Sequence, residues 1–268
     1  MMALIGVSIG ASFALSMLLG PMVNGWVGIS GIFYGTAMLA LVGIAILFLF
    51  VPEPAESHFH RDAEVETQSL KSVLKDSQLL RLDFGILTLH FVLMCVFLVM
   101  PLILHSEYAI EAENHWQVYL PVFALSLVIM VPFIIIAERK QAMKQVFNGA
   151  IVSLIVATFL FLNNASFWLT VMALVIFFAG FILLEATLPS LVTKTAPATQ
   201  KGTAMGIYSS SQFLGAFAGG SVGGYAHQHW GIDGVFITVI VVLAIWLIFA
   251  VTMKKPGYLS TYLINVDD

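Results

Sequence analysis

Charged residues and cysteine are both scarce in this chain of 268 residues. Asp, Glu, Lys and Arg make up 10% of the residues, whereas a water-soluble domain carries about 25%. Acidic residues outnumber basic ones by 15 to 11, so no basic face is available to bind nucleic-acid phosphates. The single cysteine, Cys95, cannot form a disulfide within the chain. These shortages exclude a water-soluble globular domain, a nucleic-acid-binding protein and a disulfide framework.

Long apolar segments take the place of the missing charges, and 60% of the residues are hydrophobic. A membrane-spanning helix needs about 20 apolar residues, whereas a strand of a membrane β-barrel alternates in polarity over about ten. Residues 40–50 are apolar throughout, residues 237–249 are apolar except for Thr238, and neither segment alternates in polarity. The sequence therefore predicts an all-α, polytopic membrane protein. Its eight predicted spans lie near 4–23, 32–51, 84–104, 118–137, 146–162, 167–191, 204–225 and 235–253.

The basic residues fall only on every second connection between the predicted spans and on the tail. The connections at 105–117, 163–166 and 226–234 contain no Lys or Arg. Because cytoplasmic connections are enriched in basic residues, the basic connections and both chain ends are predicted to be cytoplasmic. The eleven basic residues are Arg61, Lys71, Lys75, Arg81, Arg139, Lys140, Lys144, Lys194, Lys201, Lys254 and Lys255.

The longest connection, residues 52–83, divides the predicted spans into two and six. Its first part is polar and flanked by prolines, which is typical of a flexible linker. In its second part, Leu70, Val73, Leu74 and Leu80 have helical spacing among charged residues. This pattern predicts an amphipathic helix that lies on the inner lipid headgroups or packs on the ends of the bundle.

Two parts of the sequence repeat each other. Residues 20–25 match residues 219–224 at an offset of 199, and residues 29–33 match residues 232–236 at an offset of 203. The first predicted helix pair thus recurs as the last pair, in the same orientation. Parallel repeats of this kind occur in transporter folds.

Glycines at helical spacing predict close contacts between helices. Gly215, Gly219 and Gly223 recur every four residues, and small residues let helix backbones approach each other in lipid. Pro21 removes the donor for the Met17 carbonyl, so we expect a bend there. For each glycine, packing alone is a sufficient role. The predicted packing residues are Gly20, Pro21, Gly25, Gly215, Gly219, Gly223 and Gly224.

Three segments resemble motifs of the major facilitator superfamily of secondary transporters. Residues 16–25 are similar to the antiporter motif of the fifth helix, although Ser16 and Asn24 replace two of its glycines. Residues 201–215 resemble the start of the eleventh helix. Glu138 and Arg139 stand where the family has a charged loop between helices eight and nine, which is degenerate here. The start of the eleventh helix and the tail are similar to the YajR-type bacterial inner-membrane transporters.

The resemblance covers essentially the whole chain and implies that its eight spans correspond to helices five to twelve of a twelve-helix fold. Residues 1–51 would complete the N-terminal half, 52–83 would link the halves, and 84–253 would form the C-terminal half. Residues 254–268 would be a cytoplasmic tail or the start of a soluble domain. A parent chain would supply four preceding helices, and the bacterial inner membrane is the expected location. A part of the transporter on its own would be inactive.

Few side chains inside the predicted spans can carry chemistry. Glu185 is the clearest, because an ionisable residue at membrane depth is costly and therefore a functional candidate. It would couple transport to protons or substrate, or pair with another helix. His90 is suited to proton transfer, or bonds a hydroxyl group in the core. Residues 209–212 would hydrogen-bond substrate or neighbouring helices. Asp83, at a helix start, is interpreted as an N-terminal charge or interface ion.

Two functions fit these features. The first is a proton-coupled secondary transporter that exports a small molecule by alternating access, with Glu185 and His90 as coupling residues and Glu138 and Arg139 as a cytoplasmic loop gate. The second is a membrane scaffold or receptor-like protein that does not transport. We expect no enzyme, no cofactor and no metal site, since paired carboxylates and metal-ligand spacing do not occur among the spans.

Overall fold

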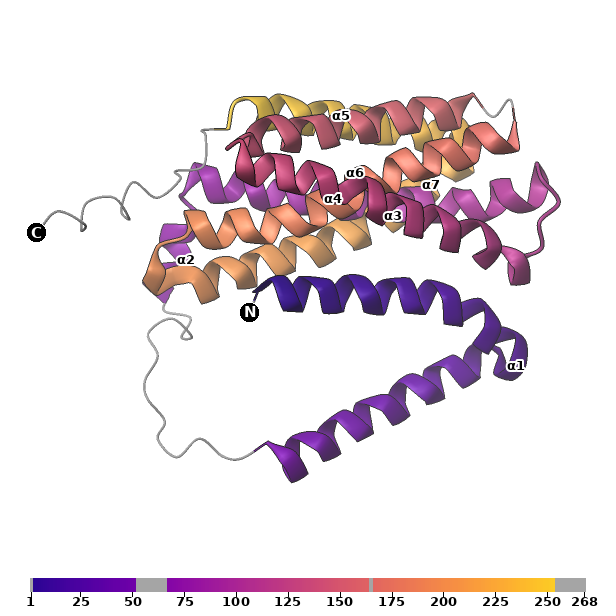
Figure 1. Cartoon of the computed structure of the whole chain (residues 1–268), viewed down its shortest axis with the longest axis horizontal. Coiled ribbons are helices and arrows are strands. Elements are labelled where there is room, and N and C mark those ends of the chain that lie inside the picture. The colour runs from indigo at the N-terminus through magenta and orange to yellow at the C-terminus, as the bar shows by residue number, and fades with distance from the viewer. Residues whose placement is uncertain (1, 52–66, 164–165, 254–268) are drawn as a thin grey trace, which may run out of the picture.

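The computed structural model describes residues 2–51, 67–163 and 166–253 (Figure 1). Within this part of the chain every regular element is helical, so the predicted all-α class is confirmed. Six of the helices are long and apolar enough to cross a membrane. The elements are α1 (Met2–Phe50), α2 (Thr67–Val73), α3 (Ser77–Ser106), η1 (Ala112–Asn114), α4 (Trp116–Arg139), α5 (Met143–Leu162), α6 (Phe167–Thr195), η2 (Ala198–Gln200) and α7 (Lys201–Val251).

Helices α1 and α7 each reverse direction at a glycine. Gly28 has φ 69° and ψ 179°, and Gly231 has φ 66° and ψ −163°. Glycine alone adopts this backbone region readily, because it has no Cβ. Figure 1 shows α1 as two arms that meet at an acute angle. The sequence predicts eight apolar segments, whereas the structure has six long helices. The numbers differ because each of these two reversals joins two neighbouring segments without a loop.

The two reversals are built alike. Gly28 and Gly231 are separated by 203 positions, which is the offset of the second part of the sequence repeat. Three residues after each reversal stands another glycine, Gly31 or Gly234. A Cβ on Gly31 would collide with the Val27 side chain, and a Cβ on Gly234 would collide with that of Trp230. The same glycine spacing thus forms the same backbone turn in both copies.

Helix α3 packs against the first half of α7 through the predicted glycine face. A Cβ on Gly215 would collide with the backbone of Leu87, and a Cβ on Gly219 would collide with the backbone of Phe91. A Cβ on Gly223 would lie 3.1 Å from Cys95 Sγ. Along this contact the residue numbers of α3 and of α7 increase in the same direction, so this half of α7 runs parallel to α3.

The remaining predicted packing glycines make no such contact. A Cβ on Gly20, Gly25 or Gly224 would meet nothing within 4 Å. Close helix approach at these three positions therefore stays a prediction, because no backbone in the described part of the chain lies against them. Helix α1 departs from helical backbone geometry at Gly28, seven residues after Pro21, where the sequence predicts a bend. The Pro21 side chain is not among the described ones.

Aromatic side chains fill the space between α5, α6 and the second half of α7. The Phe161 and Phe236 rings stack at 5.4 Å, and Phe147 meets Trp246 edge to face at 5.9 Å. At the end of α7, the Arg81 guanidinium donates to the Thr252 carbonyl at 2.7 Å. Helices α3 to α7 therefore close into one bundle with a buried apolar core.

Helix α1 lies at the edge of this bundle. It contacts α4, η1 and α6, while its second arm extends away from the other helices (Figure 1). Large apolar side chains on that arm are exposed, including Phe33, Tyr34 and Phe48.

The amphipathic segment is divided into two helices. α2 ends at Val73, and Asp76 then caps α3 by accepting from the backbone N–H groups of Gln78 and Leu79. The structure therefore has two helices where the sequence pattern predicts one over residues 70–81. The Asp76 carboxylate is an N-cap, and an N-cap starts a new helix. α2 packs against α7 and Val73 is buried.

Candidate functional site

Three polar side chains from three different helices meet inside the bundle. Gln212 Nε2 from α7 lies 2.8 Å from His90 Nε2 of α3 and donates to Glu185 Oε1 of α6 at 3.4 Å. His90 Nε2 and Glu185 Oε2 are 3.9 Å apart. The His90 and Glu185 side chains are 13% and 28% exposed. The structure thus joins the two residues that sequence analysis selected separately.

The cluster lies deep in the helices that carry it. Glu185 is ten residues before the end of α6, and Gln212 is eleven residues after the start of α7. At about 1.5 Å per residue, both lie roughly 15 Å from the end of the bundle where α3 and α7 begin. A bilayer core is about 30 Å thick, so this depth is close to half of it.

The geometry defines how a proton can be held. An amide nitrogen is only a donor, so His90 accepts at Nε2 and carries its proton on Nδ1 in this arrangement. Within the part of the chain that the structure describes, Glu185 Oε2 is buried and has no hydrogen-bond partner. If the imidazole is protonated at both nitrogens, Nε2 can no longer accept from Gln212, so the amide would have to rotate, and Nε2 could then pair with the carboxylate oxygen that lies 3.9 Å away. The pair can therefore hold a proton on either residue.

Asp83 and Tyr208 extend the polar groups toward the end where α3 begins. Asp83 is 6% exposed and Tyr208 is 4% exposed, and among the described residues Asp83 Oδ2 and Tyr208 Oη have no hydrogen-bond partner. The interpretation of Asp83 as an N-terminal charge is wrong, because Asp76 caps the helix and Asp83 is buried two turns later. Sequence reasoning missed Tyr208, although it stands one turn before Gln212.

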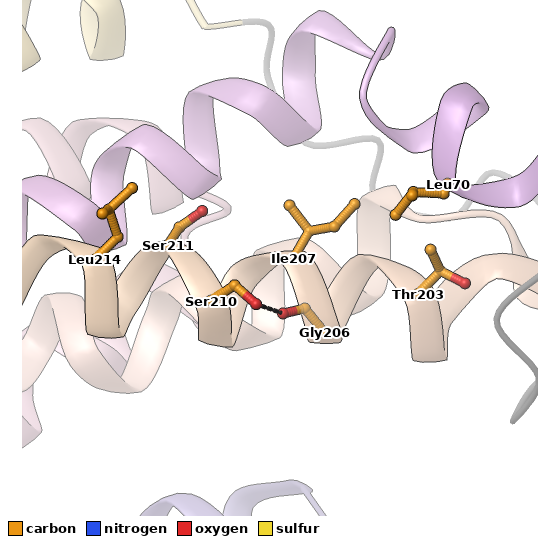
Figure 2. Close-up of a pocket in the computed structure, with 7 residues that line it drawn as sticks. All are labelled: Leu70, Thr203, Gly206, Ile207, Ser210, Ser211 and Leu214. Carbon is orange, nitrogen blue, oxygen red and sulfur yellow. Dashed lines mark hydrogen bonds between the residues drawn. The ribbon is translucent and has the colours of Figure 1, made fainter. Parts of the chain in front are cut away.

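An open groove of about 360 Å³ lies between α2 and the first half of α7. Figure 2 shows Leu70 of α2 facing a row of α7 side chains. Ser210 Oγ is bonded to the Gly206 carbonyl at 2.9 Å, whereas Ser211 and Thr203 contribute further hydroxyl groups to the wall. The seven lining residues are Leu70, Thr203, Gly206, Ile207, Ser210, Ser211 and Leu214.

The predicted loop gate is separate from this cluster. Arg139 is the exposed last residue of α4, and the Glu138 side chain is not among the described ones. Among the residues that the structure describes, no three His, Cys, Asp or Glu side chains gather closely enough to hold a metal ion.

The chain matches the family model described as "Major Facilitator Superfamily" over residues 1–220 and again over residues 144–260. The chain belongs to this superfamily. The "Inner membrane transport protein YajR" of Escherichia coli (strain K12) is 41% identical over 266 residues, covering 99% of this chain and 58% of that protein. The resemblance drawn from the sequence motifs is confirmed.

More distant relatives are uncharacterized transporters of Buchnera aphidicola. The one from subspecies Acyrthosiphon pisum is 29% identical over 264 residues, covering 96% of this chain and 66% of that protein. The one from subspecies Baizongia pistaciae is 28% identical over 256 residues, covering 93% and 64%. The chain therefore spans less than two thirds of the length of each of these relatives.

Proposed function

We propose that this chain is part of a proton-coupled secondary transporter that exports a small molecule by alternating access. The observation that carries the proposal is the partly buried contact of His90, Glu185 and Gln212. Ionisable groups at membrane depth are costly to keep and mark ion or substrate pathways. Superfamily membership and the transporter names of the relatives support the same conclusion.

The proposed arrangement in the membrane has eight crossings. Counting each arm of α1 and α7 separately gives eight helical segments, which we assign to helices five to twelve of a twelve-helix fold. Residues 1–51 would belong to the first half, 52–83 to the linker and 84–253 to the second half. Four further helices from a complete protein would cover the open side of the bundle. The proposed location is the bacterial inner membrane, with both chain ends in the cytoplasm.

Glu185 is the proposed coupling residue because its charge controls a contact between helices. An ionised carboxylate accepts a hydrogen bond about twice as strong as a neutral one does. Protonation of Glu185 would therefore weaken the bond from Gln212 and loosen α7 from α6. Release of the proton would restore the bond. A proton entering from one side and leaving to the other would thus change how the helices are held together during export.

The groove beside α2 supplies a route for the substrate in this proposal. Its wall combines leucine and isoleucine side chains with the hydroxyl groups of Thr203, Ser210 and Ser211 (Figure 2). Such a surface would suit a small molecule with apolar parts and a few hydrogen-bonding groups.

The test uses the complete transporter in proteoliposomes with an imposed pH gradient, after a substrate has been found by screening toxic compounds on an overexpressing strain. Glu185→Gln keeps the size and hydrogen bonding of the side chain but cannot ionise. We expect it to abolish proton-driven export without lowering protein abundance.

The matched control is Glu113→Gln, because Glu113 is exposed in η1. This variant should export like the wild type. Normal export by Glu185→Gln with an unchanged pH dependence would overturn the coupling role. A wild-type protein without any substrate-dependent proton flux would favour the scaffold function instead.

A further inference from the structure

A small surface at the end of α2 combines two exposed lysines with an exposed leucine. We propose that Lys71, Leu74 and Lys75 form a docking surface for the anionic phospholipid headgroups of the adjacent membrane leaflet. The inference goes beyond the proposed transport function and does not depend on it, because it concerns how the protein is held in the bilayer.

Helix α2 presents two different sides to its surroundings. Val73 is 1% exposed, and Leu70 faces α7 (Figure 2). Lys71, Leu74 and Lys75 are exposed, and Leu74 keeps 46% of its surface accessible. The Leu74 N–H donates to the Leu70 carbonyl at 3.0 Å, so the helical turn continues to this residue. Because residues three and four apart share one side of a helix, the two lysines flank Leu74 on the side that faces away from the bundle.

This side of α2 has the chemistry that binds a headgroup layer. A leucine side chain enters the boundary between headgroups and acyl chains, while lysine stems extend until their ammonium groups reach the phosphates. Among the described residues, neither Lys71 nor Lys75 pairs with an acidic side chain. The neighbouring Asp76 accepts instead from the backbone N–H groups of Gln78 and Leu79. Both positive charges are therefore available to a lipid.

The position of this surface along the bundle agrees with the level of a headgroup layer. Helix α2 lies at the end of the bundle where α3 and α7 begin (Figure 1). Leu80, three residues after the start of α3, is 40% exposed, and at about 1.5 Å per residue it lies roughly 5 Å along that helix. The exposed surface thus changes from lysine to leucine where α3 starts to cross the membrane. Lysines near the ends of spanning helices extend to the interface in this way.

Charge complementarity favours an anionic lipid over a zwitterionic one. In the described part of the chain, the exposed charged side chains at this end are all positive, namely Lys71, Lys75, Arg139, Lys140, Lys194 and Lys201. The exposed acidic side chains of the same part are all at the opposite end, namely Glu107, Glu111, Glu113 and Asp233. An anionic leaflet therefore attracts the end that carries α2.

Bound lipid would also hold one wall of the groove beside α7. Leu70 lines this groove, whereas Lys71 and Lys75 lie on another side of the same helix. Helix α2 has seven residues, and isolated helices shorter than about 12–15 residues are marginal in water. The place of α2 therefore depends on its contacts, which are α7 on one side and phospholipid on the other.

The test measures which lipids contact residue 74 in the complete transporter, reconstituted into phosphatidylcholine nanodiscs. Leu74→Cys carries a fluorescent label after other accessible cysteines have been replaced, and the buried Cys95 stays. The discs contain spin-labelled phosphatidylglycerol, which is anionic, or spin-labelled phosphatidylcholine, which is zwitterionic. The spin label quenches the fluorophore on contact. Both leaflets have the same composition, so the result does not depend on the orientation of the protein.

We expect phosphatidylglycerol to quench the label at a lower mole fraction than phosphatidylcholine does. Each lysine near an anionic surface strengthens binding about fivefold, so the half-quenching fraction should be about 25-fold lower. Lys71→Gln and Lys75→Gln should each remove about fivefold of this difference, whereas Lys71→Arg and Lys75→Arg should keep it because they keep the charge. At 1 M salt, where the Debye length is about 3 Å, the difference should disappear.

Two controls separate this surface from the general charge of the protein. The double variant Arg139→Gln with Lys140→Gln removes two exposed positive charges at the end of α4 and should leave quenching at residue 74 unchanged. A label on His229→Cys, which is exposed at the reversal of α7, should show no preference for phosphatidylglycerol, because the exposed charged side chains described at that end are acidic.

Three outcomes would overturn the proposal. Equal half-quenching fractions of the two lipids in the protein with both lysines would show that charge does not select the lipid. Quenching by neither lipid would show that protein, and not lipid, covers this side of α2. A full preference for phosphatidylglycerol in the double variant Lys71→Gln with Lys75→Gln would show that other residues bind the headgroups.

Discussion

At the scale of single residues, Gln212 determines how the buried ionisable groups are held. Its amide nitrogen contacts His90 and Glu185, whose helices do not adjoin in the sequence. An amide group keeps this capacity at every pH, because it does not titrate. Protonation of His90 at Nε2 would remove the acceptor for Gln212, so the amide would then have to turn its oxygen toward the ring.

We predict that Gln212→Met destabilises the protein by about 1–3 kcal/mol, because it preserves the side-chain length but leaves two partly buried polar groups without their donor. The measurement is unfolding of the purified protein in detergent, followed by circular dichroism. Gln117→Met is the control, since Gln117 is an exposed glutamine whose amide donates to Asn114, three residues earlier in the chain. Equal stability of the two variants would show that the Gln212 contacts contribute nothing.

At the scale of helices, the contact of α3 with α7 depends on backbones rather than on side chains. Leu87 and Phe91 present their main-chain atoms to Gly215 and Gly219. Cys95 Sγ donates to the Gly219 carbonyl at 3.4 Å. In lipid, where apolar side chains gain little from contacting one another, such close approach is a main source of helix association.

Adjacent glycines of α7 should therefore respond differently to the same substitution. Gly219→Ala places a methyl group against the α3 backbone and should cost about 1–3 kcal/mol. Gly220→Ala meets nothing within 4 Å and should be neutral or raise stability by up to about 1 kcal/mol, because alanine favours the helix. Thermal unfolding of both purified variants tests the pair. A Gly219→Ala protein as stable as Gly220→Ala would contradict the packing argument.

At the scale of the whole molecule, charge is concentrated at one end. The eight basic residues within the described part of the chain lie at or near the ends of α2, α4 and α6 and the starts of α3, α5 and α7. In Figure 1 these helix ends lie on the same side of the bundle. Cytoplasmic loops are enriched in such residues, so this end should face the cytoplasm.

Cysteine labelling tests that orientation and the double crossing of α7. Wild-type Cys95 is buried and should not react with a membrane-impermeant maleimide. Thr199→Cys, at an exposed position of η2 between α6 and α7, should react only from the cytoplasmic side. His229→Cys, at the reversal of α7, and Asn163→Cys, after α5, should react only from the opposite side. Reaction of Thr199→Cys and His229→Cys from the same side would contradict two crossings by α7.

Sequence by itself determined the all-helical class and the superfamily. Continuous apolar segments form membrane-spanning helices and lack the alternation of strands. The motifs at 16–25 and 201–215 are local sequence patterns, so they can be recognised without knowledge of tertiary contacts. The glycine face of α7 was also predictable, because residues four apart on a helix share one face. The repeat at an offset of 203 contained the signal for Gly28 and Gly231, since both stand immediately before the matching segments.

Tertiary structure alone decided which polar groups meet. Gln212 is 122 residues from His90 and 27 residues from Glu185 along the chain, and only the packing of α3, α6 and α7 brings their atoms together. Packing likewise buried Asp83 and left Gly224 facing open space, although Gly223 beside it contacts Cys95. The periodicity of a helix fixes which residues share a face, but the neighbour that covers this face depends on how the whole chain folds.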